Sequence, residues 1–315
     1  MNLLALFEIS DQNLNRLAQI PNLTVIKPDD LTPTLMTKID FIYGWGAVGP
    51  RVLEQSKQLK FIQAYSAGVD YFSLDQLAQK RVLLANVSGI HGEPIAETVL
   101  AYVLDFTRGI HAAERAQTQS KWVGDELRPT ISTLADQKAV IFGTGHIGQQ
   151  IAKRLQQFSV KTVGVNRHGH PVDYFDQVTK DDHTLDVVRQ ADFIINIMPL
   201  TTATRHFFDD RFFSALAGHQ IFINVGRGPS VDTSALIHAL DNHQLAGAAL
   251  DVFEQEPLPA DSPLWSMANV LITPHISGGF KEYGDEAFDI LMLNLQTYLK
   301  SGKLAKNEVN LKAGY

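Results

Sequence analysis

Three ionisable residues, Arg227, Glu256 and His275, each follow an apolar run that predicts a strand. An arginine guanidinium can hold a carboxylate through two parallel hydrogen bonds and polarise a neighbouring carbonyl group. A histidine can donate a proton to a carbonyl oxygen as hydride reaches the carbon, and a nearby carboxylate favours the charged imidazolium. We therefore predict a carboxylate clamp at Arg227 and a proton relay formed by Glu256 and His275, which together would serve the reduction of a 2-keto acid.

Each of these residues also has an ordinary structural explanation. Arg227 would serve as a surface ion-pair partner, Glu256 as a solvated turn residue, and His275, after a proline, as a partner of backbone groups. Their shared position at strand ends favours the catalytic interpretation, because ligands of parallel sheets bind at the carboxyl ends of the strands.

Upstream of these residues is a glycine loop, Gly143-Thr144-Gly145-His146-Ile147-Gly148. It follows the apolar run Lys138 to Phe142 and opens a helical pattern, which is the context that dinucleotide binding requires. The first glycine permits the tight turn, the second lets a pyrophosphate approach the backbone, and the third allows the helix to pack on the strand. The loop therefore predicts a dinucleotide at a helix amino terminus, although the spacing also occurs in ordinary strand-turn-helix corners.

The end of the next predicted strand bears on the choice of dinucleotide. Enzymes that use NAD place an acid there to bind the ribose 2′-hydroxyl, whereas this chain has Asn166-Arg167. Asparagine removes a charge that would repel a 2′-phosphate, and Arg167 offers a planar fork that suits one. NADP(H) is therefore favoured and NAD(H) remains possible, since Arg167 would also fit a solvated surface.

Composition limits the class of protein. The chain has 315 residues, of which 45% are hydrophobic and 19% charged, with a formal net charge of −7 and no cysteine. This length suits two domains, and the absence of a basic stripe argues against nucleic acid as a partner. Without cysteine there is no disulfide or thiolate metal site, and we predict no metal. No signal peptide or long apolar segment is present, so we expect a cytoplasmic protein without a membrane partner.

Alternation of apolar runs with helical patterns predicts an α/β fold with two doubly wound parallel sheets. We expect a first domain from residues 1–95 and 284–315, with the predicted helix Asp285 to Leu299 returning to it, and a second from residues 96–283. The predicted strands of the first are Leu3 to Phe7, Leu23 to Ile26, Ile39 to Tyr43, Phe61 to Ala64 and Val82 to Ala85. Those of the second are Lys138 to Phe142, Lys161 to Val165, Phe193 to Ile197, Ile221 to Val225, Gly247 to Val252 and Val270 to Thr273.

Over nearly its whole length the chain resembles the D-isomer-specific 2-hydroxyacid dehydrogenase family. Beyond the glycine loop, the matching stretches are Ser66 to Asp70, Ala96-Glu97, Met198 to Thr201, Asn224 to Gly228 with Val231-Asp232, Asp251 to Phe253, Glu256-Pro257, Ser262 to Trp265 and Thr273 to His275. The resemblance implies that Arg227 binds the substrate carboxylate and carbonyl, and that Glu256 orients His275 as the acid in reduction and the base in oxidation. It further implies that backbone groups of Ala67, Gly68 and Val69 bind the substrate.

The resemblance also extends the set of cofactor residues and the expected assembly. It implies a contact between Asp251 and the nicotinamide carboxamide. With the glycine loop, the predicted cofactor site comprises Asn166, Arg167, Met198, Pro199, Asn224, Val225, Gly226, Asp251, His275 and Gly278. It further implies a flavodoxin-like substrate domain and a Rossmann domain around a cleft, and a homodimer with the segment from His111 through Trp122 to Leu134 at its contact.

One aromatic feature departs from what we expect of the family, and a second aromatic residue has two competing explanations. Tyr71-Phe72 follows the substrate loop, where smaller or polar residues are expected, and Trp45 follows a predicted strand. Tyr71-Phe72 would either shape a pocket for a bulkier keto acid or pack in the core, and Trp45 would either line the cleft or pack in the core.

Several functions fit this pattern. The leading one is an NAD(P)-dependent reductase of small 2-keto acids such as glyoxylate, hydroxypyruvate or pyruvate-like compounds. A phosphoglycerate dehydrogenase is a narrower alternative, and a dinucleotide-sensing, corepressor-like binding protein on the same fold is a different one. Formate dehydrogenase is disfavoured because that relative pairs its histidine with glutamine, where this chain has Glu256.

Overall fold

The computed structural model describes residues 1–181 and 184–313. The chain divides into two compact units, the first made of Met1–Ile90 with Phe280–Tyr315 and the second of His91–Gly279. The boundaries expected from the sequence, after residues 95 and 283, fall a few residues further along the chain. Each unit contains one parallel sheet, as the alternating pattern predicts.

The first unit is built on a five-stranded parallel sheet in the order β2-β1-β3-β4-β5, which is the flavodoxin-like order of doubly wound folds. Its strands are β1 (Asn2–Ala5), β2 (Thr24–Ile26), β3 (Phe41–Tyr43), β4 (Phe61–Gln63) and β5 (Leu83–Ala85). Its helices are α1 (Asp11–Ala18), η1 (Pro28–Asp30), α2 (Pro33–Met36), α3 (Gly49–Gln55), α4 (Leu74–Lys80) and α12 (Tyr283–Ser301).

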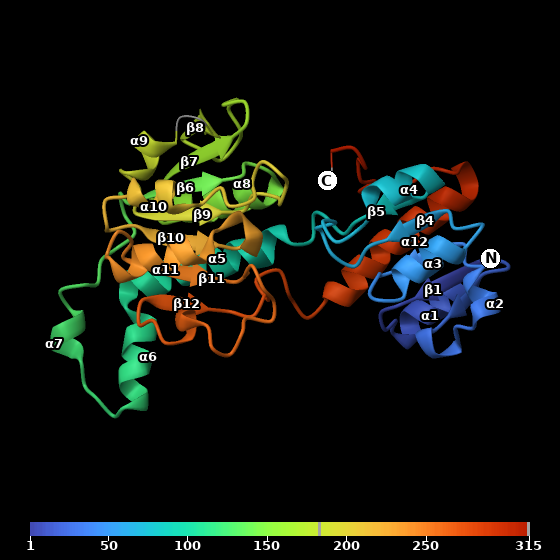
Figure 1. The fold of residues 1–315 in the computed structure, drawn as a ribbon, viewed down its shortest axis with the longest axis horizontal. Helices are drawn as coiled ribbons and strands as arrows, with labels where there is room; N and C mark the ends of the chain where they lie inside the picture. The colour runs from blue at the N-terminus through green and yellow to red at the C-terminus, as the bar shows by residue number, and fades with distance from the viewer. Residues whose placement is uncertain (182–183, 314–315) are drawn as a thin grey trace. The chain divides into compact units, whose positions relative to one another are not determined.

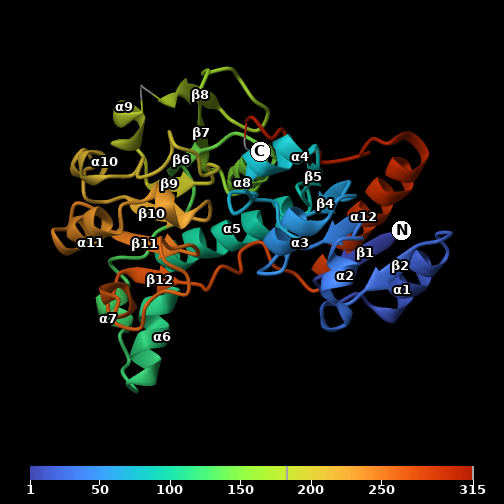
Figure 2. The same cartoon turned by 45° about the vertical axis from the view of Figure 1, so that its right-hand side comes forward.

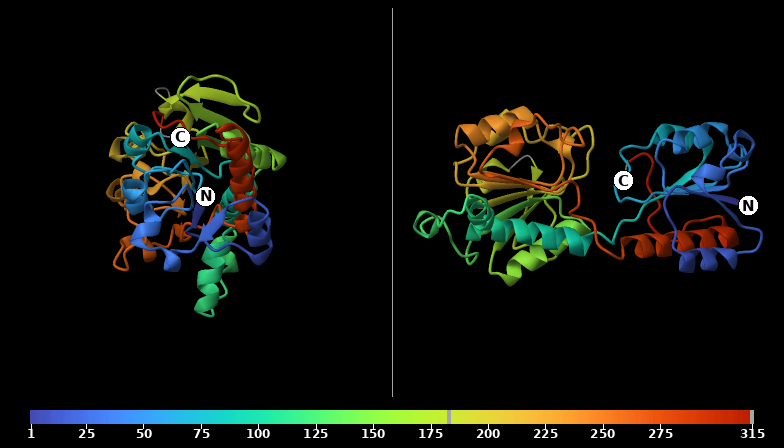
Figure 3. Two further views of the ribbon diagram at one scale, coloured as in Figure 1. Left: turned by 90° about the vertical axis from the view of Figure 1, so that its right-hand side faces the viewer. Right: turned by 90° about the horizontal axis from the view of Figure 1, so that it is seen from below.

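Helices cover both faces of this sheet because successive strand residues point to opposite sides. Leu4 of β1 packs in the cluster that contains residues of α3 and α4. Its neighbour Leu3 packs with Leu17 of α1 and Phe288 of α12. The right-hand view of Figure 3 shows α12, in red, and α1, in blue, on one side of the sheet. Beyond α12 the chain continues along the same unit, where Glu308 forms an antiparallel bridge with Ala85.

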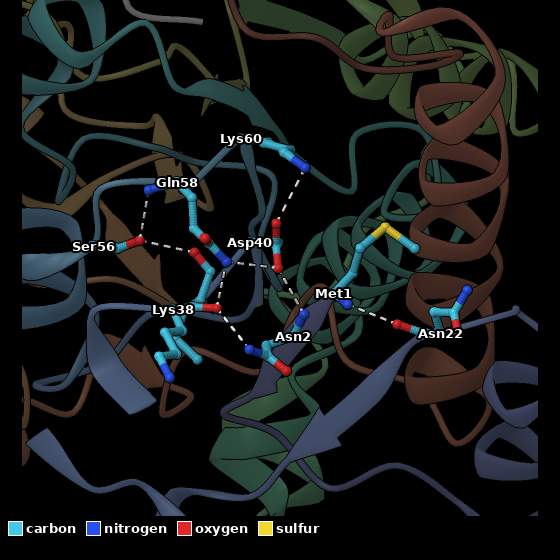
Figure 4. Close-up of polar contacts among 9 residues, drawn as sticks. Met1, Asn2, Asn22, Lys38, Asp40, Ser56, Gln58 and Lys60 are labelled. Atoms are coloured by element: carbon cyan, nitrogen blue, oxygen red, sulfur yellow. Dashed lines mark hydrogen bonds and ion pairs between the residues drawn. The ribbon is translucent and has the colours of Figure 1, made fainter. Parts of the chain in front are cut away.

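Polar contacts join the amino-terminal ends of three strands of the first unit (Figure 4). The buried carboxylate of Asp40 accepts hydrogen bonds from the amide of Asn2 at 2.8 Å and from Nε2 of Gln58 at 3.1 Å. Its other oxygen lies 3.1 Å from Nζ of Lys60. Asn2 begins β1, Asp40 precedes β3, and Gln58 and Lys60 precede β4. Polar side chains therefore join the strands at the amino-terminal edge of this sheet. The predicted substrate loop lies at the opposite edge, where the strands end.

The second unit is built on a seven-stranded parallel sheet in the order β12-β11-β10-β9-β6-β7-β8. Its strands are β6 (Lys138–Phe142), β7 (Lys161–Asn166), β8 (Gln177–Lys180), β9 (Phe193–Asn196), β10 (Ile221–Asn224), β11 (Gly247–Leu250) and β12 (Val270–Ile272). Its helices are α5 (Gly92–Arg108), α6 (Ile110–Thr118), α7 (Gly124–Leu127), α8 (His146–Gln157), α9 (Leu185–Val188), α10 (Asp210–Ser214), η3 (Gly228–Ser230), α11 (Thr233–Asp241) and η4 (Pro263–Trp265).

This sheet is also buried on both faces (Figure 1). Ile141 of β6 packs in one cluster with Val99 of α5 and Ile151 of α8. Phe142, the next residue, packs in another with Phe212 of α10 and other residues of α9 and α11. Strand order reverses between β6 and β9, which is where doubly wound sheets bind their ligands.

Each apolar run predicted as a strand is a strand in the structure, but the second sheet has seven strands where the sequence predicts six. The seventh, β8, pairs in parallel with β7 at the sheet edge. Its residues Gln177–Lys180 are exposed or half-buried, and Val178 is the single aliphatic residue among them. An edge strand of this kind lacks the continuous apolar run that marks a buried parallel strand, which is why the pattern misses it.

Helices α6 and α7 project beyond β12, at one edge of the second unit (Figure 2). Ile110, the first residue of α6, is 58% exposed, and Trp122, in the segment between the two helices, is 97% exposed. A cavity of about 510 Å³ is found elsewhere, between α1 and α12 of the first unit.

Within the described ranges no helix combines the length and apolar character that a membrane crossing needs.

Candidate active site

The glycine loop joins β6 to α8 as the sequence predicts. Gly143 has a φ of 110°, a backbone conformation that a residue with a side chain rarely adopts. A Cβ on Gly148 would lie 2.0 Å from the carbonyl oxygen of Gly143, so only glycine allows α8 to pack this closely on the loop. A Cβ on Gly145 would meet nothing within 4 Å, which leaves open space where a pyrophosphate would approach the amides at the start of α8. The loop therefore fits a dinucleotide.

Asn166 ends β7 beside this loop. Its side-chain amide donates to Oγ1 of Thr144 at 3.0 Å and to the carbonyl of His170 at 3.3 Å. Its Oδ1 accepts the amides of His168 at 3.1 Å and Gly169 at 2.7 Å. Asn166 therefore shapes the turn that follows β7, and Arg167 projects from this turn as an exposed side chain.

A buried amide network supports the segment that carries Arg227. Asn196, at the end of β9, donates to Oδ1 of Asn224 at 2.9 Å and to Oγ of Ser230 at 2.7 Å. Ser230 and Asn224 in turn donate to the carbonyl oxygen of Arg227, at 2.6 Å and 3.3 Å. The oxygen of the Asn196 side chain accepts the amide of Met198 at 3.0 Å. One network thus fixes the loops after β9 and β10, which include the predicted cofactor residues Met198, Pro199 and Gly226.

Neither Asn196 nor Ser230 is among the residues predicted from the sequence. A signal for Asn196 exists, because a buried amide directly after the apolar run Phe193 to Ile195 would need a partner at the sheet edge. Ser230 carries no comparable signal, since its partner Asn196 is 34 residues away along the chain.

The loops of Arg227 and Glu256 touch at a glycine. A Cβ on Gly228 would lie 1.8 Å from the carbonyl oxygen of Phe253, so the two backbones are in direct contact. The amide of Phe253 donates to Oε1 of Glu256 at 2.9 Å. Glu254, in the same loop, binds His206 at 2.6 Å and accepts the amide of Thr233 at 2.8 Å. These contacts hold the Glu256 loop against the Arg227 loop and the start of α11.

His275 follows β12 and faces Glu256, with Nδ1 of His275 lying 2.7 Å from Oε2 of Glu256. The backbone of His275 is left-handed, with a φ of 55°, which turns the chain directly after the strand. The side chains are 51% and 35% exposed, so solvent screens their attraction and the contact mainly orients the imidazole. With Nδ1 engaged, Nε2 is the ring atom available to a substrate.

Asp251 is completely buried beneath the His275 loop. Its Oδ1 accepts hydrogen bonds from Oγ1 of Thr273 at 2.6 Å and from the amide of Ile276 at 2.9 Å, and its Oδ2 accepts the amide of Ser277 at 3.0 Å. Its backbone carbonyl accepts the amide of His275 at 2.8 Å. The side-chain contacts of Asp251 are therefore with the loop that carries His275, and its predicted contact with a nicotinamide carboxamide stays a prediction. Gly278, at the end of this loop, packs against His91.

The predicted substrate loop lies in the first unit, after β4. Asn86 donates to the carbonyl of Ala67 at 2.9 Å, and Oγ of Ser66 donates to that of Gly68 at 2.8 Å. Val69 turns its side chain into the core. Within residues 1–181 and 184–313, the amides of Ala67, Gly68 and Val69 donate no hydrogen bond, which suits the binding of a carboxylate.

The aromatic residues near this loop divide between the two explanations. Phe72 and Trp45 are buried and pack on each other, with ring centroids 4.6 Å apart, so both belong to the core. Tyr71 is 50% exposed, and its hydroxyl lies 2.7 Å from Oγ of Ser66 in the substrate loop. Phe72 and Trp45 therefore pack in the core, whereas Tyr71 contacts the predicted substrate loop.

Residues 100–277 match the model of the D-isomer specific 2-hydroxyacid dehydrogenase NAD binding domain. The chain belongs to the D-isomer specific 2-hydroxyacid dehydrogenase family. It is 36% identical over 270 residues to glyoxylate/hydroxypyruvate reductase B of Escherichia coli, which covers 84% of this chain and 82% of that relative. The second unit is therefore a Rossmann-type nicotinamide dinucleotide domain, and the protein is an NAD(P)-dependent D-2-hydroxyacid dehydrogenase.

Solved structures agree with this assignment. One neighbour is phosphoglycerate dehydrogenase from Lactobacillus plantarum, 40% identical with a TM-score of 0.60 over 98% of this chain and 100% of that one. Another is an NADPH-dependent glyoxylate/hydroxypyruvate reductase from Sinorhizobium meliloti in complex with NADP and sulfate, 25% identical with a TM-score of 0.83 over 100% and 99% of the two chains. These comparisons support an enzyme and give no support to the alternative of a dinucleotide-sensing binding protein.

Proposed function

We propose that this dehydrogenase reduces small 2-keto acids of the glyoxylate and hydroxypyruvate class with NADPH. The observation that carries the proposal is the 2.7 Å contact between His275 and Glu256, in a unit where the Glu256 loop also touches the loop of Arg227. A carboxylate-binding cation and a paired proton donor are the groups that such a reduction needs. The named relative from Escherichia coli supports this substrate class.

Each residue would have one task. The guanidinium of Arg227 binds the substrate carboxylate and polarises the keto oxygen, and the amides of Ala67, Gly68 and Val69 serve as substrate-binding donors of the first unit. His275 holds a proton on Nε2 and gives it to the keto oxygen, while Glu256 orients the ring through Nδ1 and stabilises its charged form. The reduced dinucleotide supplies the hydride.

The dinucleotide would lie along the glycine loop, with its adenosine ribose at the end of β7. Asn166 is neutral and already donates to Thr144 and His170, so it does not repel a 2′-phosphate. The exposed guanidinium of Arg167 follows it and would pair with that phosphate. The neighbour from Sinorhizobium meliloti, described as NADPH-dependent, supports the same preference.

The assembly would be a homodimer through α6, α7 and their flanking segments, residues 111–134. The exposed indole of Trp122 supports this assignment, because tryptophan is enriched in the buried cores of protein–protein interfaces. A cavity of about 470 Å³ lined by Ala113, Trp122, Val123 and Leu127 lies in the same region and would accept an apolar side chain of a second copy.

A narrower candidate is the reduction of 3-phosphohydroxypyruvate, the reverse of phosphoglycerate oxidation. It is favoured by the phosphoglycerate dehydrogenase neighbour, which shares 40% of its residues with this chain.

A panel of glyoxylate, hydroxypyruvate, pyruvate and 3-phosphohydroxypyruvate, each assayed with NADPH and with NADH, tests both candidates. We expect loss of reduced-cofactor absorbance with glyoxylate and hydroxypyruvate and a higher kcat/KM with NADPH. A kcat/KM for 3-phosphohydroxypyruvate above all others would favour the narrower candidate. Turnover of none of the four would contradict both.

A further inference from the structure

The loop Thr273 to Ser277 places His275, and two residues of α5 contact this loop. Oγ1 of Thr98 donates to the carbonyl of Ser277 at 3.4 Å. One helical turn later, the hydroxyl of Tyr102 is hydrogen-bonded to Oγ1 of Thr273. Because residues four apart lie on the same face of a helix, α5 supports both ends of the loop.

The direction of these hydrogen bonds follows from the donors available. Thr273 has one hydroxyl proton, and Oδ1 of Asp251 accepts it at 2.6 Å. Tyr102 must then donate to Thr273, since a hydroxyl has one donor and two acceptor sites. Tyr102 is 3% exposed, and burial raises the pKa of its phenol to about 12, so it remains a donor at neutral pH.

We propose that Tyr102 is a positioning residue for His275, acting through Thr273 and Asp251. Asp251 also accepts the amides of Ile276 and Ser277, so its orientation determines the path of the backbone that carries His275. That backbone is left-handed at His275 and needs support from its surroundings. The inference rests on the proposed role of His275 as the proton donor.

Tyr102→Phe removes the donor and retains the aromatic ring. We expect kcat for keto-acid reduction to fall about fivefold, as for the loss of one buried hydrogen bond, with KM for the keto acid and Kd for NADPH within about twofold of the wild type. The matched control is Thr107→Val, which removes a buried hydroxyl from the same helix. The hydroxyl of Thr107 donates a hydrogen bond to the carbonyl of Val103 and not to the His275 loop, so kcat should not change in this variant.

A double-mutant cycle separates positioning from a general loss of stability. Thr273→Val removes the acceptor through which Tyr102 acts, so adding Tyr102→Phe to it should cause no further fall in kcat. A further fivefold fall in the double variant would overturn the proposal.

The imidazole signals of His275 provide a measurement that does not depend on turnover. In protein labelled at histidine, the signal of His275 is identified among 11 histidines by its loss in His275→Ala. Tyr102→Phe should shift this signal and Thr107→Val should leave it unchanged. If His275→Ala is slow while Tyr102→Phe retains both kcat and the His275 signal of the wild type, the role of Tyr102 fails and that of His275 stands. Full turnover in His275→Ala would refute both.

Discussion

Glu256 contacts His275 through one carboxylate oxygen and its own loop through the other. Oε2 lies 2.7 Å from Nδ1 of His275, while Oε1 accepts the amide of Phe253 at 2.9 Å. The carboxylate is therefore held in place before a substrate binds, and the imidazole is oriented without deep burial. This arrangement suits a proton carrier that must also meet solvent and substrate.

Replacing His275 by alanine should lower kcat by about 10² to 10⁴, because the variant has no group to protonate the keto oxygen. Binding of NADPH should persist, since no phosphate contact is removed. Steady-state kinetics and a cofactor titration measure the two effects. The control is His219→Ala, at an exposed position before β10. Unchanged turnover in His275→Ala would exclude the assigned role.

The Arg227→Ala variant should raise KM for the keto acid and lower kcat, because the guanidinium would act on both the carboxylate and the carbonyl. Arg227→Lys retains the charge but lacks the planar fork, so it should recover only part of the loss. Both parameters are measured with the best substrate of the panel. An unaltered KM in Arg227→Ala would show that another group holds the carboxylate.

Asn166→Asp should shift the cofactor preference toward NADH. The new carboxylate would repel a 2′-phosphate and accept a hydrogen bond from a 2′-hydroxyl. It also loses the amide that donates to Thr144 and His170, so some loss of stability is expected. The ratio of kcat/KM for NADPH to that for NADH is the measurement, and a ratio equal to that of the wild type would refute the 2′-phosphate argument.

Asp232 caps α11 and should contribute a pH-dependent stability. Its side chain accepts the amides of Ser234 at 3.0 Å and Ala235 at 3.1 Å, and hydrogen bonds from the Ser234 hydroxyl and the Ala235 amide lower the pKa of the carboxyl. Asp232→Ala should reduce the free energy of unfolding by about 1 kcal/mol at neutral pH, whereas Asp232→Asn retains a cap and should cost less.

The sign of this pH dependence follows from the lowered pKa. The charged form is the one that the folded state stabilises, so the contribution is present above the ordinary carboxyl pKa and is lost as pH falls through the folded value. Urea titrations of the wild type and Asp232→Ala at decreasing pH should therefore converge. A difference that stays constant down to acid pH would contradict the charge-dependent cap.

Much of the fold follows from local pattern. Buried parallel strands need continuous apolar runs, and Lys138 to Phe142 or Phe193 to Ile195 show them plainly. The edge strand β8 does not, because it is partly solvated, and so only its pairing with β7 reveals it. Tyr102 illustrates the same limit for the site, since helical spacing marks it as a core residue and cannot show that its hydroxyl meets Thr273.

The family, the glycine loop and the candidates Arg227, Glu256 and His275 can be recognised from residue order, because chemistry at a parallel sheet depends on which residues follow its strands. How those residues are held is visible only in the folded chain. Asn196 hydrogen-bonds to Ser230, Gly228 contacts Phe253, and Asp251 accepts a hydrogen bond from the His275 loop. The two partners of each contact lie many residues apart in the sequence. Such contacts depend on strand order and side-chain direction, which no local spacing encodes.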